Sequence, residues 1–238
     1  MSRVFLTAEW RNLILLNYEV EARLLLPFVP AGTVLDCWNA KIFLSLVGFR
    51  FTKTRVFGFP IPLHSNLTEV NLRFYVRRQE GGEVRRGVVF IREIVPRRAI
   101  ALVARTFYNE NYIALPMAHD IRTTANDGID ACYRWRSKGS WSEMHLESQG
   151  NPQPLQDGSQ EQFIAEHYWG YAGQRDGSCV AYQVTHPSWR VWQARHAEFS
   201  GDVEDIYGPE FAAVLRAKHA SAFLAEGSAV TVMRGRRL

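Results

Sequence analysis

One stretch of the chain alternates apolar and polar residues with a period of two, which is typical of a β-strand. Within residues 69–77, one face of that strand would carry Val70, Leu72, Phe74 and Val76. The other face would carry Glu69, Asn71, Arg73, Tyr75 and Arg77. A Gly-Gly turn lies in residues 79–83, so we expect a hairpin with a partner strand over residues 87–95. In that partner, Arg92 and Glu93 must point to opposite faces.

Other segments predict further strands and a mainly β fold. Residues 42–51 are apolar at both odd and even positions, which predicts a strand covered on both sides, with Arg50 as an unusual charge near its end. Residues 52–65 contain Gly58, Pro60 and Pro62 and predict a loop or irregular edge. Shorter strands are predicted over residues 11–18, 131–136, 140–147, 179–185, 188–199 and 222–234, the last broken at Glu226-Gly227.

Helical periodicity is confined to a few short segments. Over residues 97–108 the apolar positions recur at helical spacing, which indicates an amphipathic helix. Ser159 and Gln162 form a capping-box pattern that opens a helix over residues 159–167. Two more helices are predicted over residues 20–26 and 209–220. Because no internal repeat or linker interrupts these elements, we expect a single α+β domain spanning residues 1–238, built mainly from strands.

Composition and charge narrow the functional classes. Aromatic residues make up 13% of the chain, which suits sheets. The net charge is +4, and nearly all of the positive charge is carried by arginine, since the only lysines are Lys41, Lys53, Lys138 and Lys218. The arginine pairs are scattered rather than gathered in one run, so we do not expect a nucleic-acid partner. The chain shows no signal peptide and no apolar run of membrane-spanning length, which predicts a cytoplasmic protein without a membrane partner.

The common motifs of cofactor and metal sites are absent. The sequence has no dinucleotide-binding or phosphate-binding glycine motif and no nucleophile elbow, so no cofactor is predicted. Its three cysteines are far apart without a CxxC pair, and no two of its seven histidines stand at the ligand spacing of a helix or strand. We therefore expect no metal site.

Several runs resemble one family over nearly the whole chain. These are FLTAEWRNLILLNYEV, SLVGFRF, EVNLRFYVR, GVVFIREIVPRRAIALVARTFYNENY and AEHYWGY. They resemble the bacterial domain of unknown function 2071 family, which is grouped with the acetoacetate decarboxylase-like superfamily. The resemblance implies an antiparallel β-barrel with a few peripheral helices, a central cavity and a tendency to form homo-oligomers.

The resemblance also implies where this chain departs from the decarboxylases. Those enzymes use a lysine, seven residues after a helix arginine, that forms a Schiff base with a β-keto acid. Here the matching arginine is Arg105 and the residue seven positions later is Tyr112. An N-terminal arginine of the decarboxylase site falls at Ala8, whereas the glutamate of that site matches Glu69. Because a phenol cannot form an imine, Schiff-base decarboxylation at Tyr112 is not expected.

The polar face of residues 69–77 allows two interpretations. It could be a solvated sheet face or a face of ion pairs between strands. Alternatively it could face the cavity, where Glu69 could act as an acid/base group and an arginine could hold a carboxylate, with Arg73 as a candidate for ligand binding. Asn71, Arg50, Arg105, Tyr112 and His167 are further candidates for ligand binding. Each also has a structural interpretation, since arginine stems pack beside aromatics and Tyr112 and His167 could simply lie at helix ends.

Four functions follow from these interpretations. The first is a cavity protein that binds a small oxo- or carboxylated metabolite, with or without transforming it. The second is a non-enzymatic oligomeric binding or scaffold protein whose barrel is filled by aromatic side chains. The third is residual imine chemistry at Lys41 or Lys53, and the fourth is nucleic-acid binding through arginine.

Overall fold

The computed structural model describes residues 3–60, 65–97 and 111–238. The strands are β1 (Val4–Val20), β2 (Val34–Leu35), β3 (Ile42–Val56), β4 (Phe59–Pro60), β5 (Leu67–Glu80), β6 (Glu83–Val95), β7 (Tyr112–Ala114), β8 (Met117–Thr123), β9 (Ile129–Ser137), β10 (Ser140–Ser148), β11 (Gln153–Pro154), β12 (Trp169–Gly173), β13 (Cys179–Thr185), β14 (Arg190–Ser200), β15 (Ser221–Ala225), β16 (Ala229–Met233) and β17 (Arg236–Arg237). The helices are α1 (Ala22–Leu25), α3 (Gln160–Ala165), α4 (Val203–Tyr207) and α5 (Ala212–Arg216), with 3₁₀ turns at Leu26–Phe28 and Pro209–Phe211. None of the helices in these ranges is long and apolar enough to cross a bilayer.

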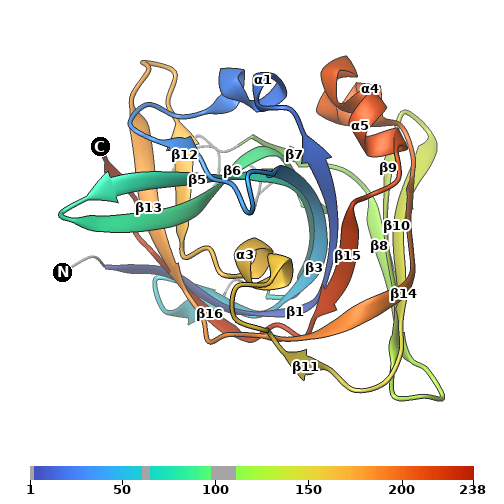
Figure 1. The fold of residues 1–238 in the computed structure, drawn as a ribbon. Coiled ribbons are helices and arrows are strands. Elements are labelled where there is room, and N and C mark those ends of the chain that lie inside the picture. The colour runs from blue at the N-terminus through green and yellow to red at the C-terminus, as the bar shows by residue number, and fades with distance from the viewer. Residues whose placement is uncertain (1–2, 61–64, 98–110) are drawn as a thin grey trace.

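Strand pairing closes a ring. β1 pairs with β3, β3 with β5, β5 with β6, β6 with β12, β12 with β13, β13 with β16, and β16 again with β1. Figure 1 shows this ring of strands around α3. The pairs are antiparallel except that β6 runs parallel to both β12 and β7, so the sheet is mixed. The expected barrel of mainly β composition is confirmed, with this mixed pairing as the difference.

A second layer of strands packs against the outside of the barrel. The C-terminal half of β1 pairs with β15, and the sheet continues through β14, β10 and β9 to β8. Tyr133, Trp135 and Met144 are fully buried between this layer and the barrel. Gly48 allows the close approach, because a Cβ there would lie 2.7 Å from Met144 Sδ and 2.8 Å from the Tyr133 ring.

A separate apolar cluster fills part of the barrel interior. The Ser159 side chain caps α3 by accepting a hydrogen bond from the Gln162 amide at 3.1 Å, as the capping-box pattern predicted. The helix then buries Phe163 and Ile164 against the inner faces of β1, β3 and β5. The Phe163 ring centroid lies 5.4 Å from that of Tyr75 and 6.3 Å from that of Phe43.

Most predicted strands are confirmed, and the differences have local causes. Residues 52–56 continue β3 instead of forming a loop, because they pair with β1 despite their polar side chains. The sequence also failed to indicate β7, β8, β12 and α4, which are short and lack clear periodicity. The helix predicted over residues 209–220 is shorter, with α5 ending at Arg216. The helix predicted over residues 97–108 lies almost wholly outside the described residues.

Replacing Gly227 with alanine should destabilise the barrel strongly. Gly227 joins β15 to β16, has a left-handed φ of +79°, and a Cβ there would meet the carbonyl oxygen of Trp10. Backbone strain and the clash together should lower the free energy of unfolding by about 3 kcal/mol, measured by urea denaturation. Gly139 is the matched control, since its φ is +89° but a Cβ there meets nothing within 4 Å. Equal losses for Gly227→Ala and Gly139→Ala would show that the close packing at Gly227 has no effect.

Candidate functional site

The polar face of β5 points into the barrel. Glu69, Asn71 and Arg73 are only 4%, 1% and 8% exposed, and Tyr75 on the same face belongs to the inner apolar cluster. The opposite face, with Val70, packs toward the second layer. The interpretation of this face as solvated is therefore wrong over residues 69–75, because barrel closure buries both faces of the strand there, whereas Arg77 is exposed.

Glu69 accepts two hydrogen bonds inside the barrel. Asn71 Nδ2 donates to Glu69 Oε1 at 3.0 Å, and the Tyr112 hydroxyl donates to Glu69 Oε2 at 3.1 Å. Asn71 stands two residues along β5, so its side chain projects from the same face as Glu69. Tyr112 begins β7, which pairs in parallel with β6. The structure thus brings together three of the residues that the sequence singled out.

Burial changes the acidity of Glu69. Removal from water raises the pKa of Glu69 from 4.5 to about 7, even though the bonds from Asn71 and Tyr112 and the charge of Arg73 act in the opposite direction. A carboxyl with a pKa near neutrality is present in both protonation states at physiological pH. It can therefore accept and return a proton, which is the requirement for a general acid/base group.

Glu93 is a second buried carboxyl that was left out of the candidate site residues predicted from the sequence. It is 2% exposed and lies directly across from Asn71 in the β5–β6 register and from Tyr112 in the β6–β7 register. Arg92 points the other way, donating from Nε to the Ile206 carbonyl at 3.0 Å, as the alternation predicted. Burial, followed by the charges of Glu69 and Glu93, raises the pKa of Tyr112 well above its ordinary value. Tyr112 therefore remains a protonated hydrogen-bond donor.

Arg73 is a buried cation beside this acidic group. Its guanidinium donates a long 3.4 Å bond to the Ile164 carbonyl of α3 and lies 5.8 Å from the centroid of the Tyr75 ring. Among the described residues Arg73 forms no ion pair with a carboxylate, although its charge acts on Glu69, and its Nε has no hydrogen-bond partner. A buried charge is costly without a partner, so this arrangement suits an arginine that receives an anion.

His167 lies in the short connection between α3 and β12 and is buried. Its ring is 4.6 Å from the Tyr75 ring and 5.1 Å from the Phe163 ring, centroid to centroid. Its Nε2 is 3.7 Å from Asp36 Oδ2, and Asp36 also pairs with Arg86 at 3.1 Å. Burial lowers the pKa of His167, so the neutral imidazole is favoured. Neither ring nitrogen of His167 has a hydrogen-bond partner among the described residues, and the role of His167 in ligand binding stays a prediction.

Two of the predicted arginines do not join this cluster. Arg50 occupies an even position of β3, on the face of Leu44 and Leu46, and it acts electrostatically on Tyr133 and His119 outside the barrel. Arg50, a candidate for ligand binding from the sequence, therefore lies on the opposite face of the sheet from Glu69 and does not contribute to a site inside the barrel. Arg105 lies outside the described residues.

The lysines lie on the outer surface. Lys41 pairs with Glu19 at 2.8 Å and Lys53 with Glu9 at 2.7 Å, and their side chains are 51% and 76% exposed. Lys138 is 77% exposed beside Asp205, and Lys218 is also exposed. Since the sequence contains no other lysine, the residue needed for Schiff-base chemistry is missing from the barrel interior.

Tyr112→Phe should raise the pKa of Glu69 further. The change removes a hydrogen bond that stabilises the ionised carboxylate, so Glu69 should hold its proton to a pH about one unit higher. Infrared titration of the protonated carboxyl band, assigned by its loss in Glu69→Gln, measures this midpoint. Tyr171→Phe removes a buried hydroxyl from the other core cluster and should leave the midpoint unchanged. A midpoint in Tyr112→Phe equal to that of the wild type would contradict the assigned role.

Comparison with known sequences identifies the family. The profile of the domain of unknown function 2071 family (DUF2071), described as an uncharacterized conserved protein, matches residues 7–229. The uncharacterized protein YqjF of Bacillus subtilis (strain 168) is 24% identical over 200 residues, covering 84% of this chain and 80% of that protein.

Comparison with solved structures identifies the fold. Acetoacetate decarboxylase from Legionella pneumophila gives a TM-score of 0.68 at 11% identity, covering 99% of this chain and 88% of that chain. The enduracididine biosynthesis enzyme MppR complexed with pyruvate gives a TM-score of 0.71 at 10% identity, covering 100% and 91% of the two chains. The chain belongs to the DUF2071 family and has the acetoacetate decarboxylase-like fold, with a tyrosine beside the buried glutamate and no lysine inside the barrel.

Proposed function

We propose that the protein binds a small oxo- or carboxylated metabolite inside the barrel, with Arg73 holding its carboxylate and Glu69 serving as acid/base group. The observation that supports this most strongly is the pairing of a buried arginine, without a carboxylate partner among the described residues, with a buried glutamate of near-neutral pKa. A planar guanidinium binds a carboxylate through two parallel hydrogen bonds. The MppR structure with pyruvate shows that a protein of this fold accommodates a small oxo acid.

The chemistry of such a site follows from its protonation states. Ionised Glu69 can remove a proton from the carbon next to the oxo group of the ligand and later return it, with no change in oxidation state. The Tyr112 hydroxyl, which stays protonated, can donate a hydrogen bond to the oxygen on which negative charge develops. These roles need no imine and no cofactor.

A borohydride experiment tests the absence of imine chemistry. Reduction in the presence of pyruvate or acetoacetate traps a Schiff base as a stable amine adduct, which mass spectrometry detects. Because Lys41 and Lys53 are exposed and paired with glutamates, we expect no specific adduct on either residue. A single adduct in high yield on one lysine would overturn the proposal of lysine-independent chemistry.

A thermal-shift comparison of matched ligands tests the binding proposal. Pyruvate, acetoacetate and 2-oxoglutarate carry a carboxylate, whereas pyruvamide has nearly the same shape as pyruvate without the charge. At least one of the acids should raise the melting temperature, and pyruvamide should not. Equal effects of pyruvate and pyruvamide, or no effect of any acid up to millimolar concentration, would count against an anion site at Arg73.

A second candidate function is supported by α3. The helix places Phe163 and Ile164 among the inner aromatic side chains, so part of the barrel is filled. In that case the protein would be a non-enzymatic oligomeric scaffold, and the exposed Phe57 and Phe59 on β3–β4 would favour contacts between copies. Light scattering that shows a stable oligomer, together with failure of every acid to bind, would favour this alternative.

A further inference from the structure

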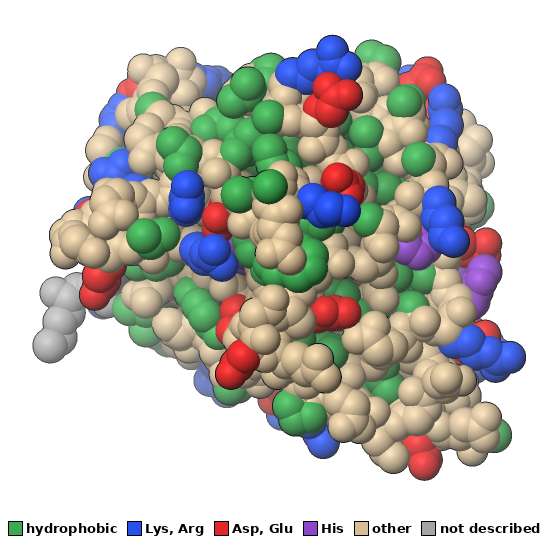
Figure 2. Space-filling view, viewed as in Figure 1, with side chains coloured by type: hydrophobic (Ala, Val, Ile, Leu, Met, Phe, Trp, Pro, Cys, Tyr) green, Lys and Arg blue, Asp and Glu red, His purple; other side chains and the backbone are tan. Residues whose placement is uncertain are grey.

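The outward face of the second layer carries a group of histidine and acidic side chains. His145 projects from β10, and His196 and Glu198 project from β14. One potential ligand atom from each of the three lies within 4.8 Å of the other two. Figure 2 shows histidine side chains among acidic and basic ones at the right of the molecule, where Figure 1 places β10 and β14.

Strand register explains why these three side chains meet. His145 stands directly across from Glu198, and His196 stands across from Glu147 on the same face. His196 Nε2 lies 3.6 Å from Glu198 Oε2. Two ligands of a tetrahedral zinc ion, each about 2.0–2.1 Å from the metal, are roughly 3.3–3.4 Å apart. The separation in the structure is therefore close to that of neighbouring zinc ligands.

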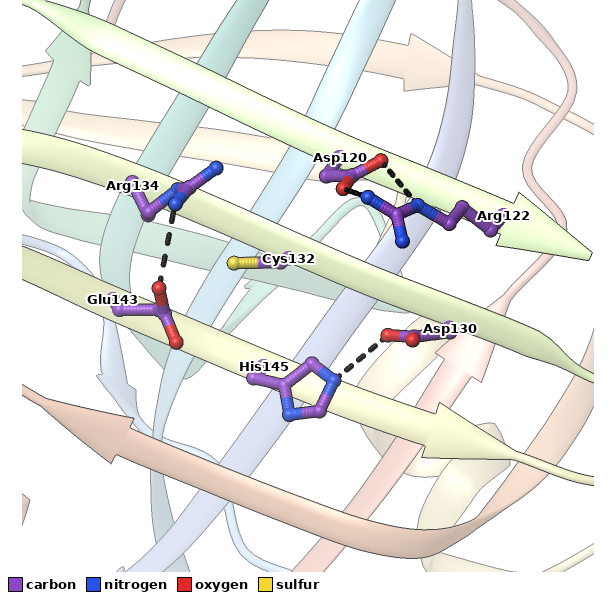
Figure 3. Close-up of a pocket in the computed structure, with 7 residues that line it drawn as sticks. All are labelled: Asp120, Arg122, Asp130, Cys132, Arg134, Glu143 and His145. Atoms are coloured by element: carbon purple, nitrogen blue, oxygen red, sulfur yellow. Dashed lines mark hydrogen bonds and ion pairs between the residues drawn. The ribbon is translucent and has the colours of Figure 1, made fainter.

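A fourth residue holds the His145 ring in place. Asp130 Oδ1 lies 2.8 Å from His145 Nε2, and Asp130 comes from the neighbouring strand β9. Figure 3 shows the other ring nitrogen of His145 on the side away from Asp130, toward β14. A carboxylate on one imidazole nitrogen fixes the ring and increases the basicity of the other nitrogen, as is usual for metal-bound histidine.

Nearby arginines are occupied by other carboxylates. Arg122 pairs with Asp120, Arg134 with Glu143 at 3.9 Å, and Arg195 with Glu147 at 3.3 Å. The carboxylates that contact the histidines, Asp130 and Glu198, are different residues from these. A surface depression of about 190 Å³ lies beside the cluster and includes Asp130 and His145 in its lining. A cation could therefore reach the histidines through solvent.

We propose that His145, His196 and Glu198 bind one Zn²⁺ ion, with water as the fourth ligand and Asp130 as the positioning residue. Two imidazoles and one carboxylate are a common donor set for zinc. The ion would add a link between β10 and β14, two paired strands of the second layer. This site lies on the surface outside the barrel, whereas Glu69 and Arg73 are buried inside it, so the zinc proposal does not depend on the proposed function.

Spacing along the chain gave no sign of this group, because its histidines come from different strands. The expectation of no metal site considered histidine pairs within one element. His196 and Glu198 are two residues apart on β14 and so share a face, but the third donor becomes visible only through the β10–β14 register.

Zinc binding can be measured on untagged protein with the exposed Cys37 replaced by serine, which removes an exposed thiol that could bind the ion. Competition with a coloured chelator gives the stoichiometry and affinity for Zn²⁺. We expect one equivalent to bind, and His145→Ala, His196→Ala and Glu198→Gln each to lower the affinity at least about tenfold. Asp130→Asn should lower it about 10- to 100-fold, as for other outer-shell carboxylates of metal sites. Glu143→Gln is the matched control, since it removes the same charge from β10 at a carboxylate that pairs with Arg134 and is not one of the proposed ligands.

Melting curves provide a second readout that is independent of the competition assay. The cluster is largely exposed, so the variants should melt like the parent without metal. Zn²⁺ should raise the melting temperature of the parent and of Glu143→Gln. It should not raise the melting temperature of the double variant that carries both His145→Ala and His196→Ala. The proposal would be overturned if this double variant bound zinc as tightly as the parent does.

Discussion

Arg73→Met should lower the affinity for a small carboxylate roughly 100-fold while leaving the fold intact. A two-bond interaction between a guanidinium and a carboxylate in a buried site contributes about 3 kcal/mol, and each 1.4 kcal/mol is a factor of ten in affinity. The free energy of unfolding should stay within about 1 kcal/mol of the wild type or increase, because the change removes a buried charge without a carboxylate partner among the described residues.

Arg77 offers a matched control for that experiment. It stands four residues further along β5, on the same alternating face, but its side chain is exposed beyond the barrel. Arg77→Met removes the same charge and should leave carboxylate affinity, measured by calorimetry with pyruvate, unchanged within about twofold. Similar losses in Arg73→Met and Arg77→Met would show that the net charge of the protein, and not a site at Arg73, attracts the ligand.

Glu69→Gln should remove a large pH-dependent loss of stability. The folded-state pKa of Glu69 is about 7, above its ordinary value of 4.5, so folded protein holds a proton in this window that unfolded protein has released. Wild-type stability therefore falls as the pH rises from about 4.5 to about 7, and stays lowered above that range. Over this pH range the stability contribution of Glu69 falls by about 3 kcal/mol in total. Urea denaturation between pH 4.5 and 8.5 should show the free energy of unfolding of Glu69→Gln rising by this amount relative to that of the wild type.

Glu80 is a control whose stability contribution does not change in this window. Its pKa is lowered below 4.5, chiefly by a hydrogen bond from Arg236, with Arg78 also contributing, so its ion pairs lose their stabilising effect only as the pH falls below about 4.5. The difference in the free energy of unfolding between Glu80→Gln and the wild type should therefore stay constant above about pH 5.5, where Glu69→Gln still gains. A stability difference between Glu69→Gln and the wild type that does not vary with pH would contradict the raised pKa of Glu69.

The sequence predicted much of the fold because its strongest patterns coincide with long strands. The alternation over residues 69–77 correctly separated the two faces of β5, and the apolar faces of residues 42–51 correctly predicted a strand covered on both sides. Short strands such as β7 and β12 could not be predicted in this way, because their burial depends on neighbours distant in the chain. The barrel itself followed from family resemblance, since local patterns do not specify which strands pair.

The candidate site was predicted in part for the same reason. Glu69, Asn71 and Arg73 share one strand, so their proximity follows from the period of two. Their burial did not follow, because a polar strand face looks the same in sequence whether it meets water or a barrel interior. The sequence does not place Glu93 opposite Asn71, because that pairing depends on the hairpin register. That register includes a bulge after Leu72, which local periodicity does not reveal.

A crystal structure of the protein soaked with the acid that gives the largest thermal shift tests the central claim most directly. We predict electron density for one ligand inside the barrel, with its carboxylate hydrogen-bonded to Arg73, its polar end near Glu69 and Tyr112, and no covalent link to any lysine. A ligand bound elsewhere, or a barrel interior filled by α3 and its aromatic neighbours with Arg73 paired to a protein carboxylate, would contradict it.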